Sequence, residues 1–251
     1  MEILIVKTFA VIAAMLIATT LTARYNHAFE TKTEFWGLFI ATLALVFIIP
    51  MTSMPINFLL ALVFAALMGA LIGPGIKGMM ISYITRKQLE KKGWTKDRLK
   101  TATEAELAEA SASITYDLSD PANHSLVSEW NNLITLAMAG TGAMTLITAS
   151  VVAFSDVDFS FLGMALFIAL IGLIVMSLLN ILFFKSPAMR LVGSYIGALI
   201  FSLFLLYDFN QLEKFVAAGD TSWETAVNVG TSIYIDIINL FMDLLNILSS
   251  R

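Results

Sequence analysis

The chain has 251 residues, of which 58% are hydrophobic and 14% charged, and its formal net charge is −4. A soluble globular domain is less apolar and carries roughly 25% charged residues, so the composition indicates an integral membrane protein. The lack of cysteine excludes disulfides and thiol chemistry. The two histidines, His27 and His124, stand in predicted loops, which argues against a histidine-based zinc site. The acidic balance argues against nucleic-acid binding.

Apolar runs follow one another along the chain, each close to the roughly 20 residues that cross a hydrocarbon core as a helix. Because backbone groups in lipid must bond within their own segment, each run predicts a helix. The first run also resembles a secretory signal, but its apolar part is long and its charged start is weak, so we favour a retained helix. The fold class is therefore all-α, a seven-transmembrane-helix bundle, with spans at 3–23, 34–52, 55–76, 131–153, 160–184, 190–214 and 225–249.

A polar segment, residues 77–130, stands between the third and fourth helices and separates 1–76 from 131–251 within one membrane domain. Its first half is rich in Lys and Arg, and its second half is rich in Asp and Glu. Thr101 with Glu104 has the spacing of a helix-capping pair. We expect a polar, partly helical insertion outside the membrane. The alternative is a docking surface for a protein partner.

The charges of the loops predict the orientation of the helices, because cytoplasmic loops collect Lys and Arg. If the polar insertion is cytoplasmic, Arg24, Lys185 and Arg251 fall on the same side. We therefore expect the N-terminus outside and the C-terminus in the cytoplasm. The chain shows no organelle address, which fits a multi-pass protein of a bacterial plasma (inner) membrane.

Two aspartates stand inside apolar spans, Asp208 in LLYDFNQ of the sixth and Asp236 in YIDIINLF of the seventh. A carboxylate at the bilayer centre costs about 2.5–3.5 kcal/mol on insertion scales, so each must face protein or water. Neighbouring antiparallel helices joined by a short loop can bring these two depths together. Two carboxylates in one dry site tend to share a proton. The arrangement is typical of a proton sensor or a cation-binding gate.

Further polar residues extend both sites. Asp236, Asn239 and Asp243 form one stripe of the seventh helix, and Tyr207 and Gln211 flank the aspartate of the sixth. A polar stripe on an apolar helix faces a cavity or another polar helix rather than lipid. We interpret these residues as a supporting polar lining. The alternative is a hydrogen-bond network that only holds the bundle together.

A GxxxG pattern, Gly193 and Gly197, lies in the sixth helix. Such pairs let two helices approach closely. We interpret this pattern as packing rather than function.

Three stretches in the second half of the chain share a recognisable pattern. They read DFSFLGMALFIALIGLIVMSLLNILFF, SYIGALIFSLFLLYDFNQL and YIDIINLFMDLLNIL. They resemble the fifth, sixth and seventh helices of the transmembrane Bax-inhibitor-motif family, in particular its bacterial members. The resemblance implies a bundle with the last helix central and a pH-sensitive calcium leak channel without enzymatic activity. In that family the aspartates matching Asp208 and Asp236 form the paired pH sensor, and here they would also be transient ligands of Ca²⁺.

The chain departs from some bacterial members in its second helix, where LALVFIIPMTSM lacks the arginine that latches onto the first aspartate. We therefore expect the closed state to rest on the carboxylate pair, Asn239 and packing.

The expected partners are the lipid bilayer, protons, Ca²⁺ as the permeant ion, and a protein partner at 77–130, with no cofactor. The rival function is a non-conducting membrane-embedded modulator that binds a partner such as a membrane-bound protease. A proton-coupled transporter would need paired interrupted helices, which we do not find. An intramembrane aspartyl hydrolase is disfavoured by the resemblance.

Overall fold

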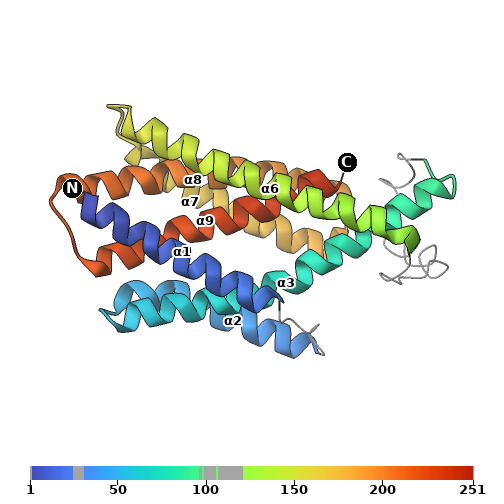
Figure 1. Ribbon diagram of the computed structural model, residues 1–251, viewed down its shortest axis with the longest axis horizontal. Coiled ribbons are helices and arrows are strands. Elements are labelled where there is room, and N and C mark those ends of the chain that lie inside the picture. The colour runs from blue at the N-terminus through green and yellow to red at the C-terminus, as the bar shows by residue number, and fades with distance from the viewer. Residues whose placement is uncertain (1, 25–30, 96–97, 99–105, 107–120, 251) are drawn as a thin grey trace. The chain divides into compact units, whose positions relative to one another are not determined.

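The computed structural model describes residues 2–24, 31–95, 98, 106 and 121–250, and no strand occurs among them. Seven stretches of these residues are helical and long and apolar enough to cross a membrane. The prediction of an all-α, multi-pass membrane protein is confirmed. The helices, shown in Figure 1, are α1 (Glu2–Arg24), α2 (Lys32–Ile48), α3 (Ile56–Lys91), α6 (Pro121–Ala153), α7 (Leu162–Leu179), α8 (Pro187–Ala217) and α9 (Trp223–Ser249). Short 3₁₀ turns, Ile49–Met51 and Phe159–Phe161, and a π turn, Asn180–Phe184, adjoin them.

The third and fourth helices are longer than predicted, because both ends of the expected insertion belong to them. α3 continues to Lys91, and α6 already begins at Pro121. Apolar side chains on one face of these charged helix ends are buried and stabilise them. Leu89 and Trp130 are 2% and 1% exposed, respectively. The Tyr83 ring lies 5.8 Å from the Trp130 ring between centroids.

A hydrogen bond joins the same two helix extensions, since the Tyr83 hydroxyl donates to Oε2 of Glu129 at 2.9 Å. Hydropathy alone ended the spans where the charges begin and missed this amphipathic pairing. Most of the rest of the predicted insertion, including Thr101 and Glu104, lies outside the described residues. So do most of the positions expected to form the docking surface.

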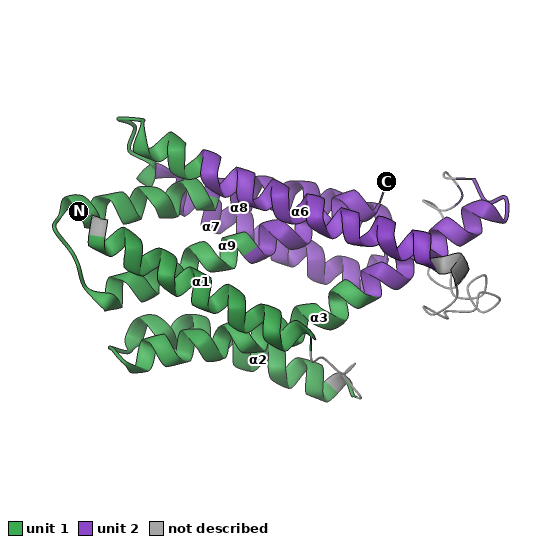
Figure 2. Ribbon diagram, viewed as in Figure 1, with its two compact units in different colours: residues 1–77, 148–160, 204–237 green, residues 78–147, 161–203, 238–251 purple. Residues whose placement is uncertain are grey.

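The chain forms two compact units, coloured in Figure 2. Unit 1 comprises residues 1–77, 148–160 and 204–237, and unit 2 comprises residues 78–147, 161–203 and 238–251. In unit 1, Thr19 of α1 donates to the carbonyl of Ala65 in α3 at 3.0 Å, and its hydroxyl lies 2.5 Å from that of Tyr234 in α9. One threonine therefore ties three helices together.

In unit 2, the turn between α7 and α8 is closed by Asn180. Its side-chain oxygen accepts from the backbone N–H of Ser186 at 2.8 Å, and its amide donates to the Ser186 carbonyl at 3.2 Å. Lys185, just before, adopts a left-handed φ of 46°. These bonds satisfy backbone groups that the helix ends would otherwise leave open.

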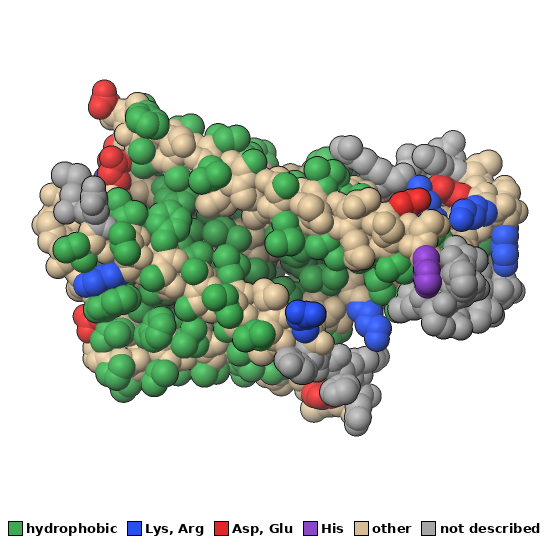
Figure 3. Space-filling model, viewed as in Figure 1, with side chains coloured by type: hydrophobic (Ala, Val, Ile, Leu, Met, Phe, Trp, Pro, Cys, Tyr) green, Lys and Arg blue, Asp and Glu red, His purple; other side chains and the backbone are tan. Residues whose placement is uncertain are grey.

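The helices differ in how much of their surface other helices cover. In the most apolar 18-residue stretch of α9, 44% of the residues are buried, against 6% in the corresponding stretch of Phe159–Phe184, which includes α7. Met164 and Phe183 of that stretch are 71% and 72% exposed. On the face shown in Figure 3, hydrophobic side chains cover the helical flanks and charged ones lie near helix ends. This pattern suits helices whose flanks contact lipid.

Candidate functional site

Asp208 of α8 and Asp236 of α9 lie together inside unit 1. Their carboxyl groups are in side-chain hydrogen-bonding contact with each other. Only 9% of Asp208 and 5% of Asp236 is exposed. Leu205 and Ile233, one turn earlier on each helix, are completely buried, so the apolar faces that fix the two helices also aim the two acids at each other.

The charges of this carboxyl pair have no basic partner. Among the residues that the structure describes, neither Asp208 nor Asp236 forms an ion pair with Lys or Arg. Oδ2 of Asp236 is buried and has no hydrogen-bond partner there either. Two buried carboxyl groups cannot both carry a charge cheaply. A single proton held between them gives one donor and one acceptor, which fits the observed contact.

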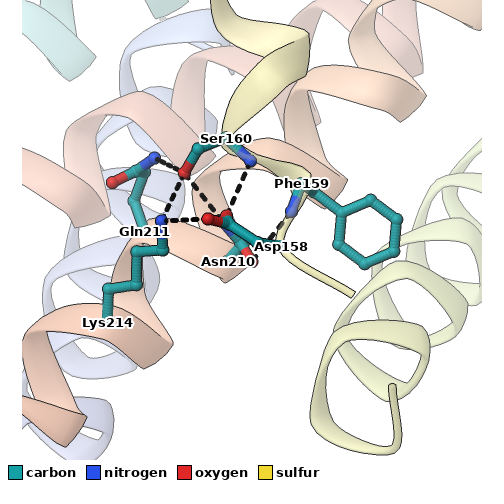
Figure 4. Close-up of polar contacts among 6 residues, drawn as sticks. All are labelled: Asp158, Phe159, Ser160, Asn210, Gln211 and Lys214. Atoms are coloured by element: carbon teal, nitrogen blue, oxygen red, sulfur yellow. Dashed lines mark hydrogen bonds and ion pairs between the residues drawn. The ribbon is translucent and has the colours of Figure 1, made fainter. Parts of the chain in front are cut away.

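A second polar cluster lies further along α8 in the same unit and is drawn in Figure 4. We call it the Asp158 network, comprising Asp158, Ser160, Asn210, Gln211 and Lys214. The Lys214 ammonium donates to Oδ2 of Asp158 at 2.8 Å and to the Ser160 hydroxyl at 2.7 Å. The Asn210 amide donates to Oδ1 of Asp158 at 3.1 Å. The network fastens the end of α8 to the segment that precedes α7.

The chemistry of Asp158 is opposite to that of the buried pair. The Lys214 ammonium, helped by the Ser160 backbone N–H and the Asn210 amide, holds the pKa of Asp158 well below its usual range. Its side chain is 61% exposed and that of Lys214 is 46% exposed, so solvent screens much of this attraction. Asp158 is therefore an anchor that keeps its charge at neutral pH.

The structure distributes the predicted lining residues over different places. The Gln211 amide donates to the Ser160 hydroxyl at 3.0 Å, so this residue belongs to the Asp158 network. Tyr207 and Asn239 are half-buried. Asp243 lies in unit 2, where its carboxylate meets Gly197 of α8. Polar residues around the membrane aspartates thus serve several sites rather than one lining.

Sequence reasoning missed two groups of this region. Lys214 and Asp158 were assigned to no site from the sequence, although the spacing of Asp158 and Ser160 is that of a turn in which the carboxylate accepts from a backbone N–H. That bond, from Ser160 to Oδ1 of Asp158, measures 3.0 Å. The Thr19 and Tyr234 contact gave no sequence signal, because the two residues are far apart in the chain.

A resident metal ion finds no ready site here. Within the described residues, no group of three or more His, Asp or Glu side chains is placed to hold one. Ca²⁺ takes six to eight oxygen ligands, so the carboxyl pair offers only part of a coordination shell.

Comparison with known proteins reveals one family and several relatives. Residues 125–251, which include both buried aspartates, match the family described as Inhibitor of apoptosis-promoting Bax1. An uncharacterized protein of Campylobacter jejuni is 35% identical over 130 residues, which are 52% of this chain and 50% of that protein. Lifeguard 1 of Arabidopsis thaliana is 33% identical over 93 residues, 37% of each chain.

The Golgi anti-apoptotic protein of Vaccinia virus is 43% identical over 91 residues, which are 36% of either chain. The matched part of this chain thus spans half of the first relative's length and little more than a third of the other two.

Proposed function

Because the chain belongs to the family described as Inhibitor of apoptosis-promoting Bax1, we propose that it is a pH-sensitive calcium leak channel gated by Asp208 and Asp236. The observation that carries this proposal is the buried contact between the two carboxyl groups, which have no basic partner among the described residues. The proposed function is not enzymatic, because the aspartate pair would change the conformation of the helices and would not act on a substrate.

The proposed gate works through the proton that the pair shares. With one proton, Asp208 and Asp236 hold α8 and α9 together by a hydrogen bond. Without it, two like charges about 4 Å apart repel by about 4 kcal/mol at an effective dielectric constant of about 20. The cheapest relief is to separate the carboxylates and admit water. Hydrated carboxylate oxygens then attract a hard cation, and Ca²⁺ prefers such ligands.

No described Lys or Arg forms an ion pair with Asp208 or Asp236, which distinguishes this gate from a carboxylate held by an arginine. Here the proton alone supplies the closing interaction, supported by the buried side chains Leu205 and Ile233. We expect closure at lower pH and leak at higher pH. The proposed setting is a bacterial inner membrane with a cytoplasmic C-terminus. Labelling a cysteine introduced at Lys185 from the outer side with an impermeant reagent would contradict that orientation.

Calcium flux into liposomes tests the proposal. The purified protein is reconstituted around a fluorescent Ca²⁺ indicator, and influx is compared between about pH 6 and about pH 8, where a shared buried proton is expected to leave. Influx of the wild type should rise with pH. In Asp208→Asn and Asp236→Asn, which cannot ionise at that position, the ratio of the two rates should fall to about 1.

Asp158→Asn is the matched control, because it changes the same residue type in the same unit at a site that keeps its charge throughout this range. It should retain the pH dependence. Absence of Ca²⁺ influx at every pH would contradict the channel function and would favour the non-conducting modulator. If the pH dependence of Ca²⁺ influx is kept in both Asp208→Asn and Asp236→Asn, the aspartate pair is not the gate.

A further inference from the structure

A third carboxylate in a membrane helix, Asp243 of α9, has no part in the proposed gate. It lies in unit 2, where its carboxyl group forms a side-chain hydrogen bond with Ser194 of α8. Ser194 is only 6% exposed, and its oxygen accepts from the Asn246 amide at 2.8 Å. Because that acceptor is already used, the serine proton is free to point at Asp243. The three side chains form one oriented chain of hydrogen bonds.

Gly197 provides the space for this carboxylate. A Cβ atom at that position would overlap Oδ2 of Asp243 more closely than real Cβ atoms approach, and would lie 3.0 Å from its Cγ. Gly193, the other half of the GxxxG pattern, differs, because its Cβ would meet only Cε of Met176 at 3.2 Å. A methionine end is flexible and can move aside. The second glycine therefore makes room for a charged group as well as for helix packing.

The charge of Asp243 is not balanced by a basic residue. Within the part of the chain that the structure describes, no Lys or Arg makes an ion pair with it. A carboxylate at membrane depth needs a proton, a cation or strong hydrogen bonds. Asp243 is half-buried rather than fully enclosed by protein.

The oxygen atoms gathered here match a hard cation. Asp243 offers two and the Ser194 hydroxyl offers one, while the Asn246 amide donates to that hydroxyl and orients it. Hard cations bind carboxylate, hydroxyl and amide oxygens and complete their shell with water. We propose that Asp243 and Ser194, with Asn246 orienting the serine hydroxyl, form a second cation site, beside Gly197, that takes a small hard cation such as Ca²⁺. The site would give the permeant ion of the proposed leak another binding position on α9. Its role in conduction rests on the proposed function, whereas its binding of the cation does not.

Binding is measured directly, with Ca²⁺ alone as the probe, as a rise in the unfolding temperature of the purified full chain in detergent. A ligand that binds only the folded state raises stability with its concentration. Ca²⁺ should raise the unfolding temperature of the wild type and of Asp208→Asn, but not that of Asp243→Asn. Ser194→Ala, a milder change, should need at least about tenfold more Ca²⁺ for the same rise, as is usual when a supporting ligand is lost.

The two glycines supply a matched pair of variants. Gly197→Ala should displace the carboxylate and weaken Ca²⁺ binding by about tenfold or more, whereas Gly193→Ala should leave it unchanged. In an Asp243→Ala background, Gly197→Ala should have no further effect on Ca²⁺ binding. Equal weakening by both glycine substitutions would mean that GxxxG serves packing alone, and would overturn the site.

The outcomes separate this site from the proposed leak. If liposomes show no Ca²⁺ influx but Asp243→Asn abolishes the Ca²⁺-dependent rise, the leak fails and the site stands. If influx is pH-dependent but the rise is the same in the wild type, Asp243→Asn and Ser194→Ala, the site fails and the leak stands.

Discussion

Asp158 and Asp236 are the same residue type in the same compact unit, but their surroundings give them opposite properties. Asp158 is 61% exposed and is bonded by Lys214, Ser160 and Asn210. Asp236 is 5% exposed, and one of its oxygens has no partner within the described residues. A compensated carboxylate is a fixed anchor, whereas an uncompensated buried one has an energy that depends on its proton.

α8 carries parts of both sites only two residues apart. Asn210 belongs to the Asp158 network, and Asp208 belongs to the buried pair. The network fixes that end of α8 to the segment before α7 through its bonds to Asp158 and Phe159. The end of α8 is thus fixed by the Asp158 network, and its interior is held to α9 by a shared proton. Loss of that proton can therefore move the interior of α8 while its end stays in place.

The largest expected effect is on the buried pair. In Asp208→Asn with Asp236→Asn, the free energy of unfolding should rise relative to the wild type by about 2–3 kcal/mol between about pH 5 and about pH 8. The reason is that ionised carboxylates without partners cost several kcal/mol to bury, and amides do not ionise. Unfolding in detergent, followed by tryptophan fluorescence, measures the difference. If the free energy of unfolding depends on pH in the same way in the wild type and the double variant, ionisation of the pair does not destabilise the folded protein.

A smaller effect is expected at the junction of the two sites. Asn210 is 4% exposed and makes hydrogen bonds with Asp158, Ser160 and the Phe159 backbone N–H. Asn210→Ala should lower the free energy of unfolding by about 1–3 kcal/mol, because it removes the three hydrogen bonds that this buried amide makes. This loss should be the same at about pH 6 and about pH 8, since an amide does not titrate.

Gln211→Ala is the control for this variant, because it removes a single bond, to Ser160, from a side chain that is only half-buried. It should cost less than Asn210→Ala. If the two cost the same, the network does not depend on the buried amide, and the contrast between the sites loses its structural basis.

The sequence was sufficient for the helices and the family but not for the division of labour among polar residues. Apolar length predicted the spans because lipid imposes it, and the family resemblance is confirmed by the match over residues 125–251. The helix ends at Lys91 and Pro121 were missed because hydropathy averages over Tyr83 and Trp130, whose apolar faces pair only in three dimensions.

The polar residues of α8 show the same limit. Gln211 stands close to Asp208 in sequence, but its amide binds Ser160. Gly197 reads as a packing residue until the carboxylate beside it is seen. Spacing along one helix gives the face of a residue, whereas its partner is decided by another helix that no spacing describes.

The smallest expected effect belongs to the exposed anchor. The pKa of Asp158 is lowered in the folded protein, mainly by the Lys214 ammonium. A lowered folded pKa means that the anchor stabilises the fold above the unfolded value of about 3.9, and that this stabilisation is lost as pH falls through the folded value. Asp158→Asn should therefore lower the unfolding temperature by no more than about 2 °C, equally at every pH from about 5 to 8.

The gap between the wild type and Asp158→Asn should close only in stronger acid, and it should narrow when salt is raised, because both partners are largely exposed. A gap that instead changes between about pH 6 and about pH 8 would mean that Asp158 titrates in the range assigned to the buried pair. The two carboxylates would then differ in exposure but not in chemistry, and the pH dependence of any leak would have to be assigned anew.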